Sequence, residues 1–197
     1  MYIPKHFREK DTEKIKSFIK THNFGVILSN DGSEMVGTHL PFILVENEDG
    51  TFYFKSHLAA ANPQLNHWKK NSNCLIIFSG PHGYVSPSLY EEKQNVPTWN
   101  FIAVHVYGTI KVYDDFDQKK DLLIESINSF EPEYMKQWDE LNSKYRDKLI
   151  HGMTGMDIQI TKIEAKYKLS QNKPDSTRKN VADHFTDEGN ELGKFME

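Results

Sequence analysis

The sequence predicts an α+β protein, mainly antiparallel β, built on a small six-stranded barrel with flanking helices. Two turn sequences, Asn30-Asp31-Gly32 and Asn47-Glu48-Asp49-Gly50, separate short strand-like runs and favour antiparallel hairpins. Most helical patterns come late in the chain, so they flank the strands and do not alternate with them. Closing the strands into a barrel would remove exposed sheet edges.

The elements follow in order from their local patterns. Asp11 can cap a helix, because Ile15, Phe18 and Ile19 follow at helical spacing. A short helix is expected from Asn62 to Lys70. The six expected strands are residues 24–29, 35–45, 51–58, 74–79, 99–113 and 156–167. Two apolar stripes at helical spacing predict packing faces on two further helices: Phe116, Leu123, Ile127 and Phe130, then Tyr134, Trp138, Leu141, Tyr145 and Leu149.

The most informative segment is 80–108, where Gly- and Pro-rich stretches, expected to be turns, precede a long alternating strand. From Asn100 to Val112, every second residue forms an almost wholly apolar face, which we expect to enter the core. The other face runs from Trp99 to Tyr113 and mixes aromatic with polar side chains. Such a face is typical of a partner surface or of a site for a flat aromatic ligand.

Composition limits the classes of function. The chain has 197 residues and a net charge of −4, with 28 acidic and 24 basic side chains, so charge gives DNA binding no support. No apolar run approaches the roughly 20 residues of a membrane span, and the charged start is unlike a signal peptide. We therefore expect a cytoplasmic protein without membrane contact. The single cysteine, Cys74, lies in an apolar run and is expected to be a buried, inert thiol.

Residues 1–172 are expected to form one domain with a helical insertion at about 115–150, followed by a polar tail or loose helix at 173–197. The chain has no GxSxG, P-loop or GxGxxG motif, which leaves hydrolase, NTPase and Rossmann functions without support. Its histidines lack a compact metal-ligand spacing, so we expect no metal site. Small residues at 59–61 before Asn62 could admit a ligand near the backbone, although Asn62 could simply cap a helix.

Several longer motifs occur in one order: MYIPKHF at the start, THLPF at 38–42, GPHGYVSPS at 80–88, VPTWNFIAVHVYG at 96–108 and EAKYKLSQN at 164–172. With the Asn-Pro-Gln segment at 62–64, they strongly resemble the PaiB family of FMN-binding negative transcriptional regulators. The resemblance spans residues 1 to about 172. It implies the FMN-binding split-barrel fold and a homodimer that holds two flavins at its interface.

The resemblance also implies a cofactor site. Strand residues 38–41 would run along the isoalloxazine and ribityl chain, residues 56–62 would lie near the phosphate, and the loop at 84–86 would contribute side chains. Residues at 99–105 would come from the other subunit, and residues at 168–171 would come from the last strand. The implied FMN-binding residues are Thr38, His39, Leu40, Pro41, Ser56, His57, Ala61, Asn62, Tyr84, Ser86, Trp99, Asn100, His105, Lys168, Ser170 and Gln171.

Three positions depart from the family pattern: Ala60 replaces a basic residue of some relatives, and Leu65 and Leu89 replace tryptophans. Losing a cation near a phosphate weakens local electrostatics, although Lys55, His57 or Lys168 can substitute. Three functions stay open: a flavin-binding regulator, a flavin-dependent oxidoreductase or flavin reductase, and a haem-binding split barrel. No residue stands out as a required catalytic acid or base.

Overall fold

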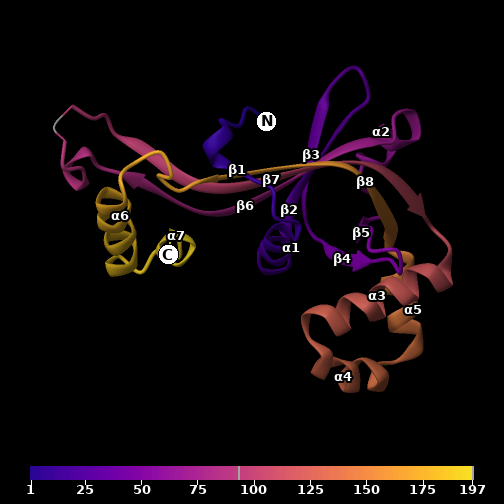
Figure 1. Ribbon diagram of the computed structural model, residues 1–197. Helices are drawn as coiled ribbons and strands as arrows, with labels where there is room; N and C mark the ends of the chain where they lie inside the picture. The colour runs from indigo at the N-terminus through magenta and orange to yellow at the C-terminus, as the bar shows by residue number, and fades with distance from the viewer. Residues whose placement is uncertain (93, 197) are drawn as a thin grey trace. The chain divides into compact units, whose positions relative to one another are not determined.

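The computed structural model describes residues 1–92 and 94–196 and contains an eight-stranded sheet and several helices (Figure 1). The strand order is β3-β2-β6-β7-β8-β5-β4, with β1 paired to β8. Every pairing whose register is known is antiparallel. The strands are β1 Arg8–Glu9, β2 Phe24–Asn30, β3 Met35–Pro41, β4 Ile43–Glu46, β5 Phe52–Ala59, β6 Asn73–Val85, β7 Thr98–Tyr113 and β8 Met153–Lys168.

The α+β class and the antiparallel sheet are confirmed, but the count of six strands and the closed barrel are wrong. The expected strand at 35–45 is divided into β3 and β4, and Arg8–Glu9 near the N-terminus forms the additional strand β1. The division follows Pro41, which cannot donate to a strand ladder. The next amide, Phe42 N, bonds Asn23 O at 2.9 Å. β3 and β4 stand at the two ends of the strand order, so the sheet is open.

The chain forms two compact units. Unit 1 comprises Met1–His22, Phe78–His105 and Glu164–Glu197, and unit 2 comprises Asn23–Ile77 and Val106–Ile163. Each of β6, β7 and β8 contributes residues to both units.

Unit 1 contains helices α1 (Thr12–Thr21), α6 (Asp175–Asp187) and α7 (Leu192–Met196), with the 3-10 turns η1 (Lys5–Phe7) and η2 (Pro87–Leu89). Asp11 caps α1 as predicted, accepting from the amides of Glu13 and Lys14. Phe18 of α1 lies 5.7 Å from the Tyr167 ring of β8, and its ring lies against Gly80. α1 therefore packs on β6 and β8.

The segment GPHG at 80–83 is strand, not the expected turn, because β6 continues to Val85. Its glycines serve packing: a Cβ at Gly80 would meet the Phe18 ring, and one at Gly83 would lie 2.3 Å from the Phe185 ring of α6. Of the two alternatives for residues 173–197, a polar tail or a loose helix, the structure has helix. α6 and α7 lie side by side (Figure 1), and they bury Val181, Phe185 and Leu192 almost completely.

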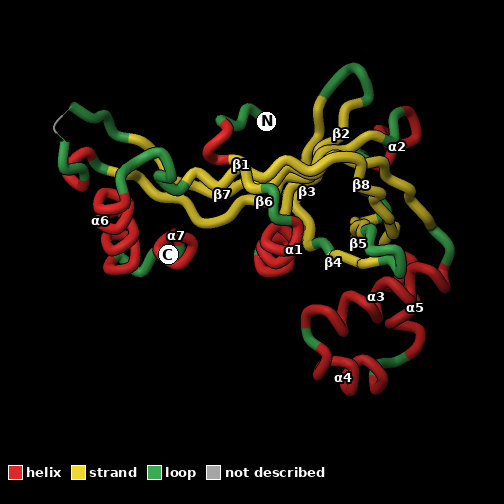
Figure 2. Tube along the Cα trace, in the orientation of Figure 1, coloured by secondary structure: helices red, strands yellow, loops and turns green. Residues whose placement is uncertain are grey.

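Unit 2 contains the hairpins β2–β3 and β4–β5 and helix α2 (Leu65–Lys70). The remaining elements are α3 (Phe116–Phe130), η3 (Pro132–Tyr134), α4 (Met135–Glu140) and α5 (Ser143–His151), which gather in one group (Figure 2). The predicted stripes do not define their packing face. Leu122, Trp138 and Ile150 are buried, whereas Phe130, Tyr145 and Leu149 are exposed.

The two faces of β7 are as predicted. Every even-numbered residue from Asn100 to Ile110 is buried, and the odd-numbered residues from Phe101 to Thr109 are only half-buried. Cys74 is buried as expected, and burial raises the pKa of its thiol to about 12. Among the described residues, no helix is long and apolar enough to cross a membrane.

Candidate functional site

The predicted site residues fall into two groups, one in each unit. Unit 2 holds those of the β3 end, β5 and the loop before α2, and unit 1 holds those of β6, β7 and the β8 end. The first group is Thr38, His39, Leu40, Pro41, Ser56, His57, Ala61 and Asn62; the second is Tyr84, Ser86, Trp99, Asn100, His105, Lys168, Ser170 and Gln171.

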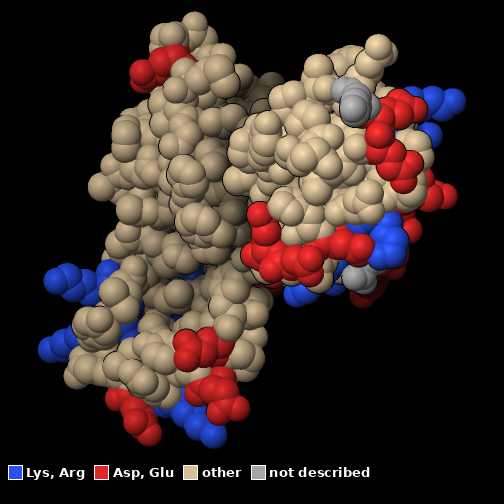
Figure 3. Space-filling model, turned by 90° about the vertical axis from the view of Figure 1, so that its left-hand side faces the viewer, with Lys and Arg blue, Asp and Glu red and all other residues tan. Residues whose placement is uncertain are grey.

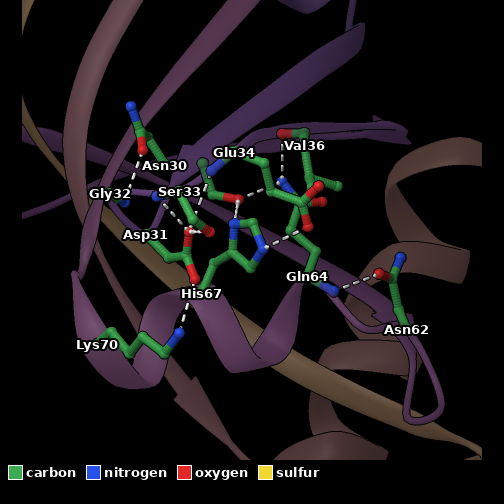
Figure 4. A network of polar contacts seen from close by, with 11 residues as sticks. Asn30, Asp31, Gly32, Ser33, Glu34, Val36, Asn62, Gln64, His67 and Lys70 are labelled. Atoms are coloured by element: carbon green, nitrogen blue, oxygen red, sulfur yellow. Dashed lines mark hydrogen bonds and ion pairs between the residues drawn. The ribbon is translucent and has the colours of Figure 1, made fainter.

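In unit 2, a hydrogen-bond network ties β3 to the loop before α2. Thr38 Oγ1 donates to Gln64 Oε1 at 2.5 Å and accepts from Asn62 Nδ2 at 3.3 Å. Asn62 Oδ1 accepts from the Gln64 backbone N–H at 2.9 Å, a contact visible in Figure 4. Asn62 therefore shapes the turn that leads into α2, which is close to the capping role considered from the sequence.

Gln64 is the centre of this network, and the sequence analysis missed it. Its side chain is fully buried, and Nε2 donates to Ile27 O, Val36 O and Ser29 Oγ at 3.0–3.2 Å. Ser29 in turn bonds His67 of α2 at 3.2 Å. The Asn-Pro-Gln motif contained a signal, but only the tertiary fold shows that the glutamine side chain points inward.

Ser56 and His57 lie on β5, and Ser56 contacts Pro41, the residue at which β3 ends before β4 begins. Ser56 Oγ donates to Pro41 O at 2.6 Å, so it holds the end of β3 against β5. Its lone pairs stay available to accept a hydrogen bond. His57 pairs with Gly155 of β8, and burial lowers the pKa of its imidazole. The shift favours the neutral imidazole.

The other residues of this group are placed differently. His39 is exposed and its ring stacks on Phe24 at 6.2 Å, whereas Leu40 is buried. Ala59, Ala60 and Ala61 form an exposed run of small side chains. Of this run, only the backbone offers hydrogen-bonding groups to a ligand.

In unit 1, Asn100, Lys168 and Ser170 line one cavity of about 230 Å³. Asn100 is fully buried, and its Nδ2 donates to Ser170 Oγ at 3.0 Å. Lys168 Nζ donates to Thr98 Oγ1 and to the Trp99 carbonyl. Burial, together with nearby Lys166, lowers the pKa of Lys168. Residues that the sequence analysis missed complete the wall: Phe7, Tyr90, Asn95, Val96, Thr98, Asn172 and Lys173.

Two predicted residues serve local structure. Gln171 Nε2 donates to Tyr167 O at 2.6 Å, and its Oε1 accepts from the Leu169 amide at 2.8 Å. Ser86 Oγ caps η2 by accepting from the Ser88 amide at 3.2 Å. Both side chains therefore stabilise the local backbone turns in which they lie.

Tyr84 and Trp99 form an exposed aromatic pair with ring centroids 6.0 Å apart, and His82 lies 5.8 Å from the Trp99 ring. Trp99 is 53% exposed and Tyr84 is 49% exposed. His105 lies farther along the same face of β7, where burial and then the N-terminal amine lower its pKa, while Glu164 opposes the shift. Large rings exposed next to one another are unusual on the surface of a monomer.

Comparison with known proteins decides the family. A profile of the family described as "Putative FMN-binding domain" matches residues 1–162. The chain is also 34% identical to the Protease synthase and sporulation protein PAI 2 of Bacillus subtilis strain 168, over all of this chain and 94% of that protein. The chain belongs to the PaiB family of FMN-binding domains. An uncharacterized protein of Saccharomyces cerevisiae is 30% identical over 73% of this chain and 98% of its own length.

Solved structures support the split-barrel fold of the PaiB family. The FAD and heme binding protein of Mycobacterium smegmatis superposes with a TM-score of 0.63 at 15% identity, covering 89% of this chain and 79% of that one. The flavocytochrome Anf3 of Azotobacter vinelandii gives a TM-score of 0.62, also at 15% identity, over 84% and 72%. At such low identity these likenesses concern the fold alone.

FMN is the cofactor that this PaiB-family chain is built to take. The donor chemistry of the described residues fits such a group. Hydroxyl oxygens can accept from ribityl hydroxyls, amide and ammonium groups can donate to ribityl and phosphate oxygens, and exposed rings suit the isoalloxazine. Unit 2 offers the hydroxyl oxygens of Thr38 and Ser56, and unit 1 offers the amide of Asn100 and the rings of Tyr84 and Trp99.

Proposed function

We propose that the protein is an FMN-binding homodimer, with the flavin held where the odd-numbered face of β7 meets a second copy. The exposed pair Tyr84 and Trp99 is the observation that carries this proposal. Phe101, Ala103 and His105 extend the same face and are half-buried. A second subunit or a flat cofactor would cover these rings and remove the cost of exposing them.

Bound FMN supplies redox chemistry, and the side chains of the chain bind and orient it. Ser56 can accept a hydrogen bond from a ribityl hydroxyl, because its own proton is engaged with Pro41 O. Thr38 keeps one lone pair after its contacts with Gln64 and Asn62. These groups are held by a fixed network, so little conformational entropy is lost when a ligand binds.

The dimer is tested by Trp99→Ala, with Tyr145→Ala as a matched control, because Tyr145 is 54% exposed on α5. We expect Trp99→Ala to weaken both dimerisation and FMN binding, measured by sedimentation and by flavin fluorescence quenching. Tyr145→Ala should change neither. A wild-type chain that stays monomeric at micromolar concentration with FMN present would contradict the shared site.

For the biological role, the proposal is regulation through a partner, without a DNA-binding surface of its own. The support is the charge balance of 28 acidic to 24 basic side chains. On the face drawn in Figure 3, basic and acidic side chains are interspersed. Proteins that bind DNA through its phosphates usually have a continuous basic surface. We expect no mobility shift of promoter DNA at low salt, and a strong, salt-sensitive shift would refute this part.

A flavin-dependent oxidoreductase is the second candidate, and two histidines favour it. Burial lowers the pKa of both His57 and His105, which favours the neutral imidazole that a proton acceptor requires. NAD(P)H oxidation by the FMN-loaded protein, slowed by His57→Gln or His105→Gln, would support this function. Absence of NAD(P)H oxidation would favour the regulator.

A further inference from the structure

Among the described residues, the lining of the cavity of unit 1 has two lysines and no carboxylate. Lys168 and Lys173 both line it. Lys168 Nζ is held by two neutral oxygens of β7, those of Thr98 and of the Trp99 backbone. Lys173 Nζ donates to Asn95 Oδ1 at 2.6 Å and lies 4.6 Å from the centre of the Tyr90 ring. Two ammonium groups at one cavity repel each other unless an anion joins them.

Neither lysine forms an ion pair with a carboxylate of the described residues. Glu91 and Glu92 line a smaller neighbouring cavity with Lys173, but no ion pair joins them to it. Among the described residues, the charge that lowers the pKa of Lys168 further is that of Lys166, which has the same sign. The cavity therefore has unpaired cationic groups that are partly withdrawn from water, where an anion binds more strongly than at an open surface.

Two buried neutral groups face the same cavity. Asn100 and Ser170 exchange hydrogen bonds at 3.0 and 3.3 Å, and Ser170 is only 4% exposed. Ser170 has a φ of +61°, the only positive value for a non-glycine among the described residues. Such backbone strain is typical of ligand sites. The Ser170 hydroxyl can turn to donate to an anion while still accepting from Asn100 Nδ2.

We propose that this cavity binds the phosphate or carboxylate of a small molecule, with Lys168 and Lys173 as its cationic partners and Ser170 as a hydrogen-bond donor. The rings of Phe7 and Tyr90 line the cavity beside the lysines, so they can contact an apolar or aromatic body attached to the anion. A volume of about 230 Å³ suits such a group better than a whole dinucleotide.

The anion has two chemically equivalent sources, the phosphate of FMN and the anionic group of a second small molecule. The cavity is built from residues of unit 1 alone, and three of them, Asn100, Lys168 and Ser170, are also predicted FMN-binding residues, so its anion binding has to be measured without flavin. Inorganic phosphate and phenyl phosphate are suitable probes, because they carry the anion without an isoalloxazine ring.

The test compares Lys168→Met and Lys173→Gln with the control Lys166→Met in calorimetric titrations of flavin-free protein at constant ionic strength. Lys166 lies two residues from Lys168 on β8 and does not line the cavity. We expect Lys168→Met to weaken phosphate binding about tenfold or more, because it removes a charge-assisted hydrogen bond. Lys173→Gln should weaken it severalfold and Lys166→Met by about twofold at most.

A second titration uses FMN-loaded protein. If FMN prevents phosphate binding, the flavin phosphate occupies the cavity; if both bind together, a second small molecule does. Unchanged phosphate affinity in Lys168→Met, or no phosphate binding by the folded wild-type chain, would overturn the proposal. Failure of FMN binding alone would overturn the proposed cofactor site and leave this one standing.

Discussion

Replacing Gln64 with methionine tests whether the unit 2 network holds the β2–β3 hairpin to α2. The side chain is fully buried and contacts four polar partners, Ile27 O, Ser29 Oγ, Val36 O and Thr38 Oγ1, through two amide hydrogens and one carbonyl oxygen. Methionine fills a similar volume without these bonds. At about 1 kcal/mol for each lost bond, unfolding should become about 3–4 kcal/mol more favourable.

Such a loss corresponds to a melting temperature lower by about 10 °C for a chain of this size. Thermal unfolding followed by circular dichroism measures the shift, with urea titration for the free energy of unfolding. Gln118→Met is the matched control, because Gln118 is exposed on α3 and should tolerate the change within about 0.5 kcal/mol. If Gln64→Met unfolds at the wild-type temperature, the network does not stabilise unit 2 as argued.

Three further changes test single features of the fold. Burial lowers the pKa of His57, so as the pH falls below about 6.5 the unfolded chain takes up this proton before the folded chain does. The wild type should therefore lose stability below this pH, and His57→Gln should lose less. Equal pH profiles of the two proteins would refute this. Burial raises the pKa of Asp157, so its ionised carboxylate lowers the stability of the folded protein when the pH is above 3.8, the ordinary pKa of the group. Asp157→Asn should therefore unfold at a higher temperature than the wild type at pH 7 but not at pH 3. Gly155→Ala would place a Cβ 2.3 Å from the Tyr113 ring and should lower the free energy of unfolding by about 1–3 kcal/mol. At Gly152 the nearest atom is 3.4 Å away, so Gly152→Ala should be tolerated. Equal urea midpoints of the two variants would refute the clash.

Local patterns predicted the parts of the fold that depend on neighbours in sequence. Asp11 caps α1 because its side chain reaches the next amides, and β7 buries alternate residues because strand side chains alternate. Features set by distant contacts were missed. Gly80 and Gly83, expected in a turn, lie in β6 and pack closely against Phe18 and Phe185, which are far away in the sequence.

The candidate site divides in the same way. Family motifs identified Asn100, Lys168 and Ser170, which the structure brings to one cavity. They did not identify Lys173, whose place beside Tyr90 and Asn95 depends on how the C-terminal segment packs. Likewise, the polar composition of residues 173–197 allowed a tail or a loose helix but did not predict that Val181 and Phe185 are buried within unit 1.

Titration of the flavin-free protein with FMN, followed by absorbance and flavin fluorescence, tests whether this chain binds FMN. We predict saturable binding of one FMN per chain at micromolar concentration, with quenched fluorescence and shifted flavin bands. Haem added in a parallel titration should produce no saturable Soret shift. Absence of FMN binding by the folded protein, or saturable binding of haem in its place, would contradict the account.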